Sequence, residues 1–481
     1  MSIPPVATPT ARLQLGLAVG DITPPADIYH RLWGAARHDQ ATGVHRPLRA
    51  SVLAFAPETG SSEIRYLIAL DLCLFRPPEM EEIRSNLASQ SGVPADRVTF
   101  TFSHTHSSGN FSRERAHLPG GNRIGPYLDG LPSKLAALLQ DATERLAPVT
   151  LTAGTGVCAM GHNRDLADVS RGQYVCGFNP VEPPGLPLTA VRMTDDAGKT
   201  RGTVVNYPCH PTTLAWDNSL ISPDYIGTLR ETVEQATGAP CIFLLAACGD
   251  TGPRHGYVGD VESADRNGRQ VGFTALATLE ALPADHHDQH YVGPVFSGAT
   301  LAEWKFLPHD AARQASTQTF LCRRIVVPLR YLPGQPTVPQ AEADLVNTAA
   351  SEAEAAARGD ADEVARLRAL GERHRRLLER IRPLPEGLNY PFEVDVWRTG
   401  DLVWLAIEGE PYHALQSELM KRFPQVTFVI SVLANGARPS YLPERHDYGK
   451  PLYQVEIALL SPGSLEQLTD AISAEVQNLL A

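Results

Sequence analysis

Short apolar, β-branched runs recur along this chain of 481 residues and alternate with stretches of helical spacing. Runs of about four to eight such residues, bounded by polar residues or glycine, are typical of buried strands. The clearest runs are Tyr66–Leu70, Val98–Phe102, Gly202–Val205, Ile242–Ala246, Leu402–Ile407 and Val426–Leu433. Helical patterns such as Pro132–Ala147 and Tyr225–Thr237 lie between them. The sequence therefore predicts an α/β fold, with a mixed β-sheet core covered by helices.

The segment at about 340–382 differs from the rest because it is rich in alanine, glutamate and arginine. Its apolar residues follow helical spacing, and Pro383 and Pro385 end the pattern. We expect one or two long surface helices that form an inserted arm on a single domain spanning residues 1–481. Whether the arm covers a functional site stays open at this point.

Composition excludes several classes of partner and compartment. With 42 basic and 54 acidic residues, the net charge of −12 disfavours binding to nucleic acid or anionic membranes. Several of the seven cysteines lie inside apolar runs and none forms a CxxC motif, which is typical of buried free thiols in a reducing compartment. We find no secretion signal at the first residues and no apolar run of about 20 residues. These features predict a cytoplasmic protein without stable membrane anchoring.

Polar clusters follow five of the apolar runs at their carboxyl ends, where ligands bind in open α/β sheets. If these strands share a sheet and a direction, the clusters meet in one crevice. The clusters are Ser103–Asn110, Tyr207–Thr213, Cys248–Pro253, Glu408–Pro411 and Ala434–Tyr441.

His104 and His106 form an H-x-H pair, and on an extended segment both imidazoles point to the same face. Such a pair binds one metal ion, or one ring binds the metal while the other meets the substrate, or both are ordinary hydrogen-bonded histidines. His210 and Glu410 at other strand ends favour the metal, since imidazoles with a carboxylate are the usual ligands of catalytic zinc.

Asp250 and the pair Asn163-Arg164 are further candidate site residues, and each also has a purely structural interpretation. Asp250 lies in the turn Gly249–Pro253 and is either a helix cap or a site residue. Asn163-Arg164 could place a guanidinium against an anionic or carbonyl group, although a surface arginine is an equal interpretation.

The order of these clusters resembles the neutral/alkaline non-lysosomal ceramidase family over nearly the whole chain. The resemblance rests on the segments Gly20–Pro25, Gly43–His45, Ser103–Ser107, His210–Thr212, Gly249–Asp250, Gly409–Glu410, Tyr441 and Tyr453–Glu456. It implies the fold of that family's catalytic domain and hydrolysis of an amide bond at a single zinc ion.

Carried over position by position, the resemblance implies a ligand set, a proton carrier and an oxyanion donor. The zinc ligands would be His104, His210, Glu410 and Tyr441, with Tyr448 as the alternative to Tyr441. His106 would face the substrate, His106 or Asp250 would carry the proton, and Tyr453 would stabilise the oxyanion. Asn163 and Arg164 would lie near the substrate.

Two departures from the family pattern bear on the substrate. Gly252 stands where the family has a serine, and the chain ends about thirty residues after Tyr453, without the family's immunoglobulin-like domain. We therefore expect a ceramidase-like enzyme for a smaller, more soluble acyl amide, in which water attacks without an acyl-enzyme. A homo-oligomer is compatible with the sequence.

Other classes remain as alternatives. An ester or lactone hydrolase would use the same zinc chemistry, and hydrolases of the amidohydrolase or metallophosphoesterase type also carry H-x-H or Gly-Asp motifs. One metal ion per chain favours the ceramidase-like interpretation, and two favour those superfamilies. A non-catalytic metal-binding protein is a third class, but it would not need Tyr453.

Overall fold

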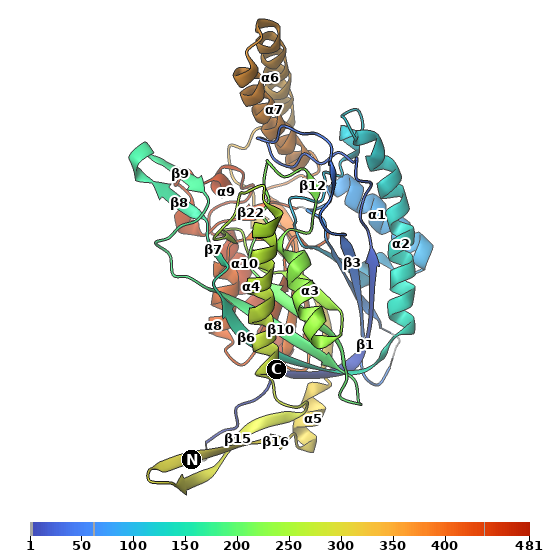
Figure 1. The fold of residues 1–481 in the computed structure, drawn as a ribbon, viewed down its shortest axis with the longest axis vertical. Coiled ribbons are helices and arrows are strands. Elements are labelled where there is room, and N and C mark those ends of the chain that lie inside the picture. Colours follow the sequence, from blue (N-terminus) through green and yellow to red (C-terminus); the bar gives the residue numbers. More distant parts are fainter. Residues whose placement is uncertain (1–2, 61–62, 437) are drawn as a thin grey trace.

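A computed structural model describes residues 3–60, 63–436 and 438–481. Its largest element is a strongly twisted eight-stranded sheet (Figure 1). Only the pairs β4–β5 and β11–β13 are parallel, so the sheet is mixed. Its strands, in spatial order, are β13 (Cys241–Leu245), β11 (Thr200–Tyr207), β10 (Leu186–Thr194), β6 (Ala147–Cys158), β1 (Thr10–Asp21), β3 (Arg49–Ala56), β4 (Arg65–Leu70) and β5 (Val98–Phe102).

A second sheet of four strands packs against the first. Its order is β17 (Phe320–Arg330), β18 (Asn389–Thr399), β19 (Leu402–Ile407) and β21 (Thr427–Ser431). Aromatic rings fill the space between the sheets: Phe55 of β3 lies 5.8 Å from Trp397 and 5.2 Å from Trp404, between ring centroids. The apolar layer that these rings share with strands of both sheets removes one face of each sheet from water.

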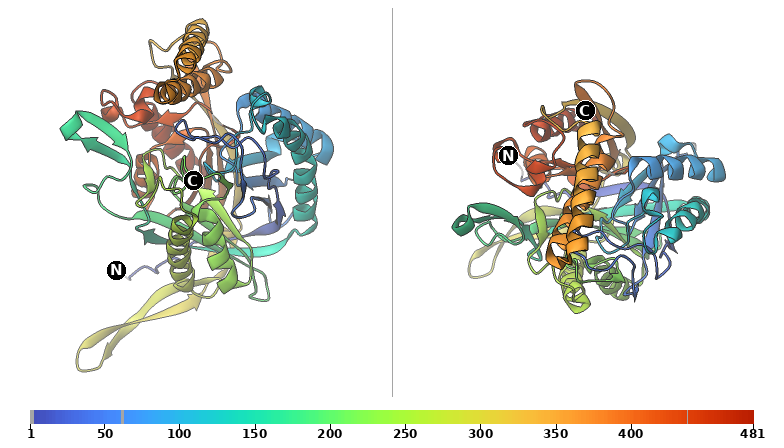
Figure 2. Two further views of the ribbon diagram at one scale, coloured as in Figure 1. Left: turned by 45° about the horizontal axis from the view of Figure 1, so that its top comes forward. Right: turned by 90° about the horizontal axis from the view of Figure 1, so that it is seen from above.

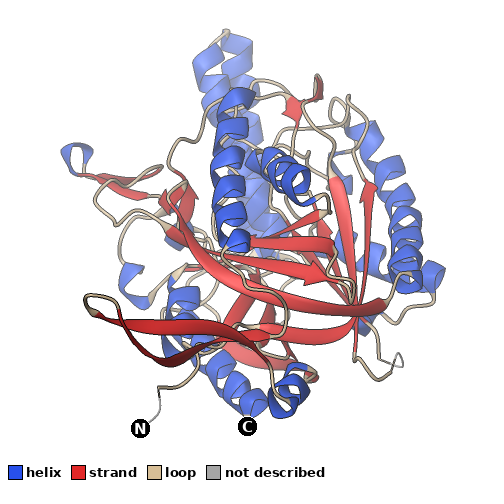
Figure 3. Cartoon of the chain, turned by 60° about the horizontal axis from the view of Figure 1, so that its bottom comes forward, coloured by secondary structure: helices blue, strands red, loops and turns tan. Residues whose placement is uncertain are grey.

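Helices cover the outer faces of both sheets (Figure 3). On the large sheet, α2 (Ile124–Glu144) packs on β1 and β3, and α4 (Val261–Glu280) packs on β6 and β10. Beside them lie α1 (Pro77–Ser91), against α2, and α3 (Tyr225–Thr237), against β13. On the small sheet lie α8 (Ala414–Arg422) and α10 (Ser464–Leu480). The predicted α/β class is confirmed, although the core contains two sheets rather than one.

Most predicted elements agree with the structure, and one is wrong at both ends. The runs Val98–Phe102 and Leu402–Ile407 and the helix Tyr225–Thr237 have the predicted bounds. The helix expected from Pro132 begins instead at Ile124, and Ala147 is the first residue of β6. The proline misled the prediction because it lacks an N–H donor and usually marks the first turn of a helix.

The alanine-rich segment forms a hairpin of two helices, α6 (Val338–Arg358) and α7 (Ala361–Ile381), which projects from the body (Figure 1). Thr337 and Gln340 form a capping box at its start, and Gly359 ends α6 at a φ of 74°. Viewed from above, the hairpin crosses over the body (Figure 2). At the other end of the molecule β15 (His287–Phe296) and β16 (Thr300–Pro308) extend as a ribbon.

Short elements complete the described chain. They are β2 (Gly43–Val44), β7 (Gly161–Asn163), β8 (Asp165–Asp168), β9 (Gln173–Cys176), β12 (Leu220–Ile221), β14 (Thr251–Pro253), β20 (Glu410–Pro411), β22 (Tyr441–Leu442), α5 (Ala311–Thr317) and α9 (Tyr453–Glu456). None of the helices in the described residues combines the length and the apolar character needed to cross a membrane.

Candidate metal centre

The predicted polar clusters come from both sheets. They lie close together because β21 and the residues that follow it are hydrogen-bonded to strands of the large sheet. Val432 donates its N–H to the carbonyl of Leu245 in β13 (3.0 Å). Asn435 donates to the carbonyl of Phe100 in β5 (2.9 Å), and its side-chain oxygen accepts the N–H of Phe100. Asn206 of β11 is hydrogen-bonded through its side chain to both backbone groups of Ile430. These bonds link β5, β11 and β13 of the large sheet to β21 and to the residues that follow it.

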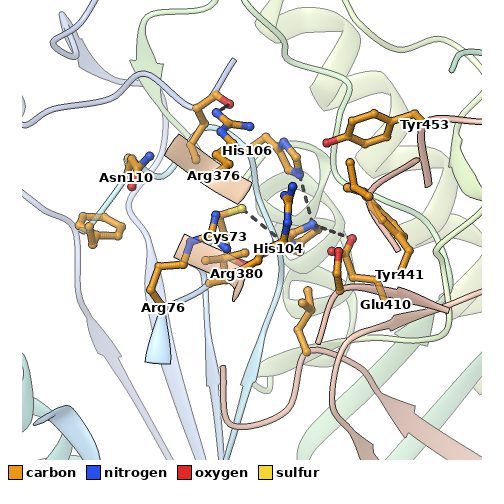
Figure 4. A pocket seen from close by; sticks show the side chains of 17 residues that line it. Cys73, Arg76, His104, His106, Asn110, Arg376, Arg380, Glu410, Tyr441 and Tyr453 are labelled. Atoms are coloured by element: carbon orange, nitrogen blue, oxygen red, sulfur yellow. Dashed lines mark hydrogen bonds and ion pairs between the residues drawn. The ribbon is translucent and has the colours of Figure 1, made fainter. Parts of the chain in front are cut away.

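His104 follows β5 in the left-handed backbone region, with a φ of 65°. Its Nδ1 lies 2.8 Å from the carbonyl oxygen of Cys73, which can only accept, so Nδ1 carries the proton. In the neutral ring Nε2 then has only a lone pair. That atom points into the centre, where it lies 3.4 Å from Oε2 of Glu410 (Figure 4).

His210 follows β11, and a hydrogen bond from its Nδ1 to a backbone carbonyl orients its ring in the same way. Its Nδ1 donates to the carbonyl oxygen of Cys248 at 2.7 Å, and Nε2 lies 3.1 Å from Oε2 of Glu410. Burial lowers the pKa of His210 to about 4, so its ring is neutral near pH 7. Nε2 of His210 therefore faces the buried carboxylate of Glu410 with a lone pair only, and Nε2 of His104 does so whenever its ring is neutral.

Glu410 stands in β20, which pairs with β22 so that Glu410 lies opposite Tyr441. Burial opposes its ionisation, but the His104 and His210 rings hold the pKa of this carboxyl well below its usual value. Burial likewise opposes a charge on His104, yet Cys73 and Glu410 raise the pKa of that imidazole well above its usual value. The centre therefore favours a positive charge between these three side chains.

A zinc ion fits this arrangement. The three potential ligand atoms of His104, His210 and Glu410 lie within 4.8 Å of one another and all three residues are buried. A tetrahedron with zinc–ligand bonds of about 2.0–2.1 Å has ligand atoms about 3.3 Å apart, close to the separations given above. Histidine Nδ1 atoms that donate to backbone carbonyls are also typical of metal ligands, since they fix the tautomer.

Three aromatic side chains surround the centre. His106 has Nε2 at 3.2 Å from Nε2 of His104, and its ring lies 5.1 Å from that of Trp33. The hydroxyl of Tyr441 is 3.5 Å from Nε2 of His210, and the half-exposed Tyr453 ring lies 6.1 Å from the Tyr441 ring. Tyr448, the alternative to Tyr441, instead donates to the carbonyl of Leu460.

The remaining predicted residues lie behind this pocket rather than on its wall. Arg164 is buried and donates from Nη2 to the carbonyl of Gly249 (2.7 Å) and to the hydroxyl of Tyr441 (3.1 Å). Asn163 pairs with Thr251 and accepts the N–H of Asp165. Asp250 accepts the N–H of His413 at 2.6 Å, and burial raises its pKa to about 6. In this structure Arg164 positions Tyr441, while substrate contacts of Asn163 and Arg164 stay a prediction.

The pocket in front of the centre has a volume of about 90 Å³. His104, His106, Glu410, Tyr441 and Tyr453 all line it. The lining also contains Asn110, from the predicted cluster Ser103–Asn110, and side chains that sequence reasoning missed: Cys73, Arg76, Arg376 and Arg380. Cys73 and Arg76 follow β4, so the strand-end rule could have found them, whereas nothing in the arm's sequence signals that Arg376 and Arg380 reach the pocket (Figure 4).

Comparison with known proteins agrees with this fold. A curated neutral ceramidase from Pseudomonas aeruginosa is 22% identical over 308 residues, which cover 61% of this chain and 45% of that protein. The chain therefore matches less than half the length of this relative. No family model matches the chain.

Two solved structures cover almost the whole chain. The neutral ceramidase of P. aeruginosa superposes with a TM-score of 0.62 at 17% identity, over 98% of this chain and 75% of the other. A ceramidase complexed with C2 gives a TM-score of 0.62 at 16% identity, over 98% and 76%. The chain therefore has the fold of these neutral ceramidases and is similar in sequence to one of them, as the order of its motifs predicted.

Proposed function

We propose that this chain is a zinc-dependent hydrolase that cleaves the amide bond of a small acyl amide. The observation that carries the proposal is the pair of imidazole lone pairs facing a buried carboxylate, at the floor of a pocket. The fold supports the choice of bond, because ceramide, the substrate of a ceramidase, is an amide.

One zinc ion per chain would be held by Nε2 of His104, Nε2 of His210 and the carboxylate of Glu410, with the Tyr441 hydroxyl as the next candidate ligand. Zinc at such a centre supplies Lewis acidity, which polarises a carbonyl and makes water acidic enough to attack at neutral pH. Arg164 holds the Tyr441 hydroxyl in place from behind.

His106 is suited to move the proton. Burial lowers its pKa well below the usual value, with His104 and His210 adding to the effect, so the ring is neutral and can accept a proton at Nε2. We assign to it the proton that the attacking water loses and that the amine nitrogen gains as the C–N bond breaks. Tyr453 would donate its hydroxyl to the developing oxyanion from the pocket rim.

Direct attack by water needs no nucleophilic serine, which agrees with Gly252 at the family's serine position. Asp250 does not line the pocket, so the proton falls to His106 in this scheme rather than to the aspartate. The small volume of the pocket, about 90 Å³, favours a compact substrate, since sites for drug-sized ligands measure about 300–1,000 Å³.

The test combines metal content with turnover. We expect one zinc ion per purified chain, hydrolysis of short N-acyl amides, loss of that activity with a chelator and its recovery with added zinc. Matched esters and lactones in the same panel decide between an amidase and an ester hydrolase. Two metal ions per chain, or hydrolysis by metal-free protein, would contradict the proposal.

We also propose that the protein works in the cytoplasm. All seven cysteines are free, and five of them are buried, which suits a reducing compartment. Cell fractionation with an antibody against the native chain tests this, and recovery from an oxidising compartment would contradict it.

A further inference from the structure

The helical arm contributes two arginines to the pocket of the candidate metal centre. Arg376 and Arg380 are four residues apart in α7, so they lie on the same face of the helix. Arg76, at the start of α1, joins them (Figure 4). Among the charged side chains that line the pocket, these three arginines face a single carboxylate, Glu410, which a metal ion would neutralise.

Two of the three arginines already have ion-pair partners. Arg76 lies 3.0 Å from Glu379, between Nε and Oε2. Arg376 lies 2.9 Å from Glu372, between Nε and Oε1, and also donates to the carbonyl of Leu32. Arg115, fully buried, pairs with both glutamates at 2.9 Å. The carboxylates of Glu372 and Glu379, both on α7, are therefore each shared between at least two guanidinium groups.

Arg380 has no such partner within the described part of the chain. No carboxylate there lies within ion-pair distance of it, and its Nε is buried without a hydrogen bond. Burial lowers the pKa of Arg380 to about 10, and the positive charges of Arg76 and Arg376 add to this effect, while Tyr453 and Glu379 oppose it only in part. A partly buried guanidinium that lies among like charges and forms no ion pair is unfavourable, so this position favours an anion from outside the chain.

We propose that Arg380 binds a carboxylate of the substrate, so that the site takes a small acidic amide, such as an N-acyl amino acid. The guanidinium fork suits a carboxylate, because two parallel N–H donors match its two oxygens. The carboxylate and the scissile carbonyl would share one small pocket, which requires them to be a few bonds apart. This inference rests on the proposed function and names its substrate class.

The experiment compares matched substrates on the intact zinc-loaded enzyme. N-acetylglycine carries the carboxylate, and N-acetylglycinamide replaces it with a neutral amide of similar size. We expect the wild type to prefer the acid, and Arg380→Gln to lower the acid-to-amide ratio of kcat/KM by about 10- to 100-fold, mainly through KM. Arg380→Lys keeps the charge but not the fork, and should fall between the two.

Arg366→Gln is the matched control, because Arg366 lies on the same helix but is exposed and pairs with Glu363. It should leave the ratio of the two substrates unchanged. Equal activity of the wild type on both substrates, or an unchanged ratio in Arg380→Gln, would overturn the assignment.

A binding measurement separates this inference from the proposed function. N-acetylglycine should bind the wild type in calorimetry and bind Arg380→Gln at least tenfold more weakly, whether or not it is hydrolysed. Binding of N-acetylglycine that depends on Arg380 but is not followed by hydrolysis would support the anion site and contradict the hydrolase proposal. Hydrolysis of both substrates without any preference for the acid would contradict the anion site and support the hydrolase proposal.

Discussion

At the scale of single residues, the candidate centre depends on which nitrogen of each imidazole carries the proton. His104 and His210 both donate from Nδ1 to backbone carbonyls, of Cys73 and Cys248, so that both Nε2 lone pairs are directed at Glu410. Backbone carbonyls cannot reverse this arrangement, since they only accept hydrogen bonds. The bond at Nδ1 therefore fixes the metal-binding tautomer of each neutral ring, and His104 must in addition lose the proton that Cys73 and Glu410 favour.

Replacing His104 with alanine removes one of the three potential ligand atoms. We expect zinc to fall well below one ion per chain and kcat/KM to fall by about 10²–10³-fold or more, since one lost electrostatic contact alone has such an effect. Metal analysis and kinetics check this. His117→Ala, at an exposed histidine, is the control, and full zinc occupancy in His104→Ala would remove this ligand from the set.

At the scale of elements, the segment from the turn after β13 into β14 has two glycines with different roles, Gly249 in the turn and Gly252 in β14. A Cβ added at Gly249 would lie 2.6 Å from the carbonyl oxygen of Glu410, so the close approach of the two chains requires glycine there. A Cβ at Gly252 would meet nothing closer than the Arg164 side chain, at 3.6 Å. The glycine at the family's serine position is therefore not required by packing.

These distances predict that a substitution at Gly249 destabilises the protein, whereas one at Gly252 has little effect on its stability. Gly249→Ala should lower the free energy of unfolding by about 1–3 kcal/mol, because it pushes β20 and its Glu410 away. Gly252→Ser should change it by less than about 0.5 kcal/mol, as for a site without a clash. Denaturant unfolding and zinc affinity of both variants measure this. Equal destabilisation by the two substitutions would contradict the packing argument.

At the scale of the whole molecule, a buried charge network fastens the arm to the body. Arg115 lies in the body and bonds to Glu372 and Glu379 of α7. Ala341, Leu378 and Ile381 of the arm add an apolar contact with Leu459. Together with the Arg76–Glu379 pair, this junction holds the part of α7 that carries Arg380 against the pocket.

The network predicts how stability depends on pH. Burial opposes ionisation of Glu372, but Arg376 and Arg115 lower its pKa from 4.5 to about 2, which corresponds to roughly 3 kcal/mol. Because the folded pKa is the lower one, this stabilisation is present above about pH 4.5 and is lost as the pH falls towards 2. Glu372→Gln should therefore destabilise the protein near neutral pH, and its difference from the wild type should shrink in acid.

Unfolding followed from pH 7 to pH 2 measures this difference. Glu363→Gln, which removes an exposed partner of Arg366, is the control and should have little effect at any pH, as for surface ion pairs generally. A Glu372→Gln difference that does not depend on pH would contradict the electrostatic explanation.

The sequence by itself predicted the α/β class and most strand positions, and it singled out His104, His210 and Glu410 as candidate ligands. Local patterns suffice for these, because apolar runs such as Val98–Phe102 must be buried and the polar residues that follow them end at a sheet edge. The order of the strand-end motifs was also enough to identify the resemblance to neutral ceramidases. The choice between Tyr441 and Tyr448, however, stayed open.

Only the tertiary structure decided which of these groups meet and in which orientation. The pairing of β20 with β22 places Tyr441 opposite Glu410, and no local pattern encodes that register. Arg380 lies at the pocket only because the arm folds against the body. Arg115, which pairs with Glu372 of the arm, is more than two hundred residues away along the chain. Contacts of this kind come from the packing of whole elements, and the free energy that selects them is spread over residues far apart in the sequence.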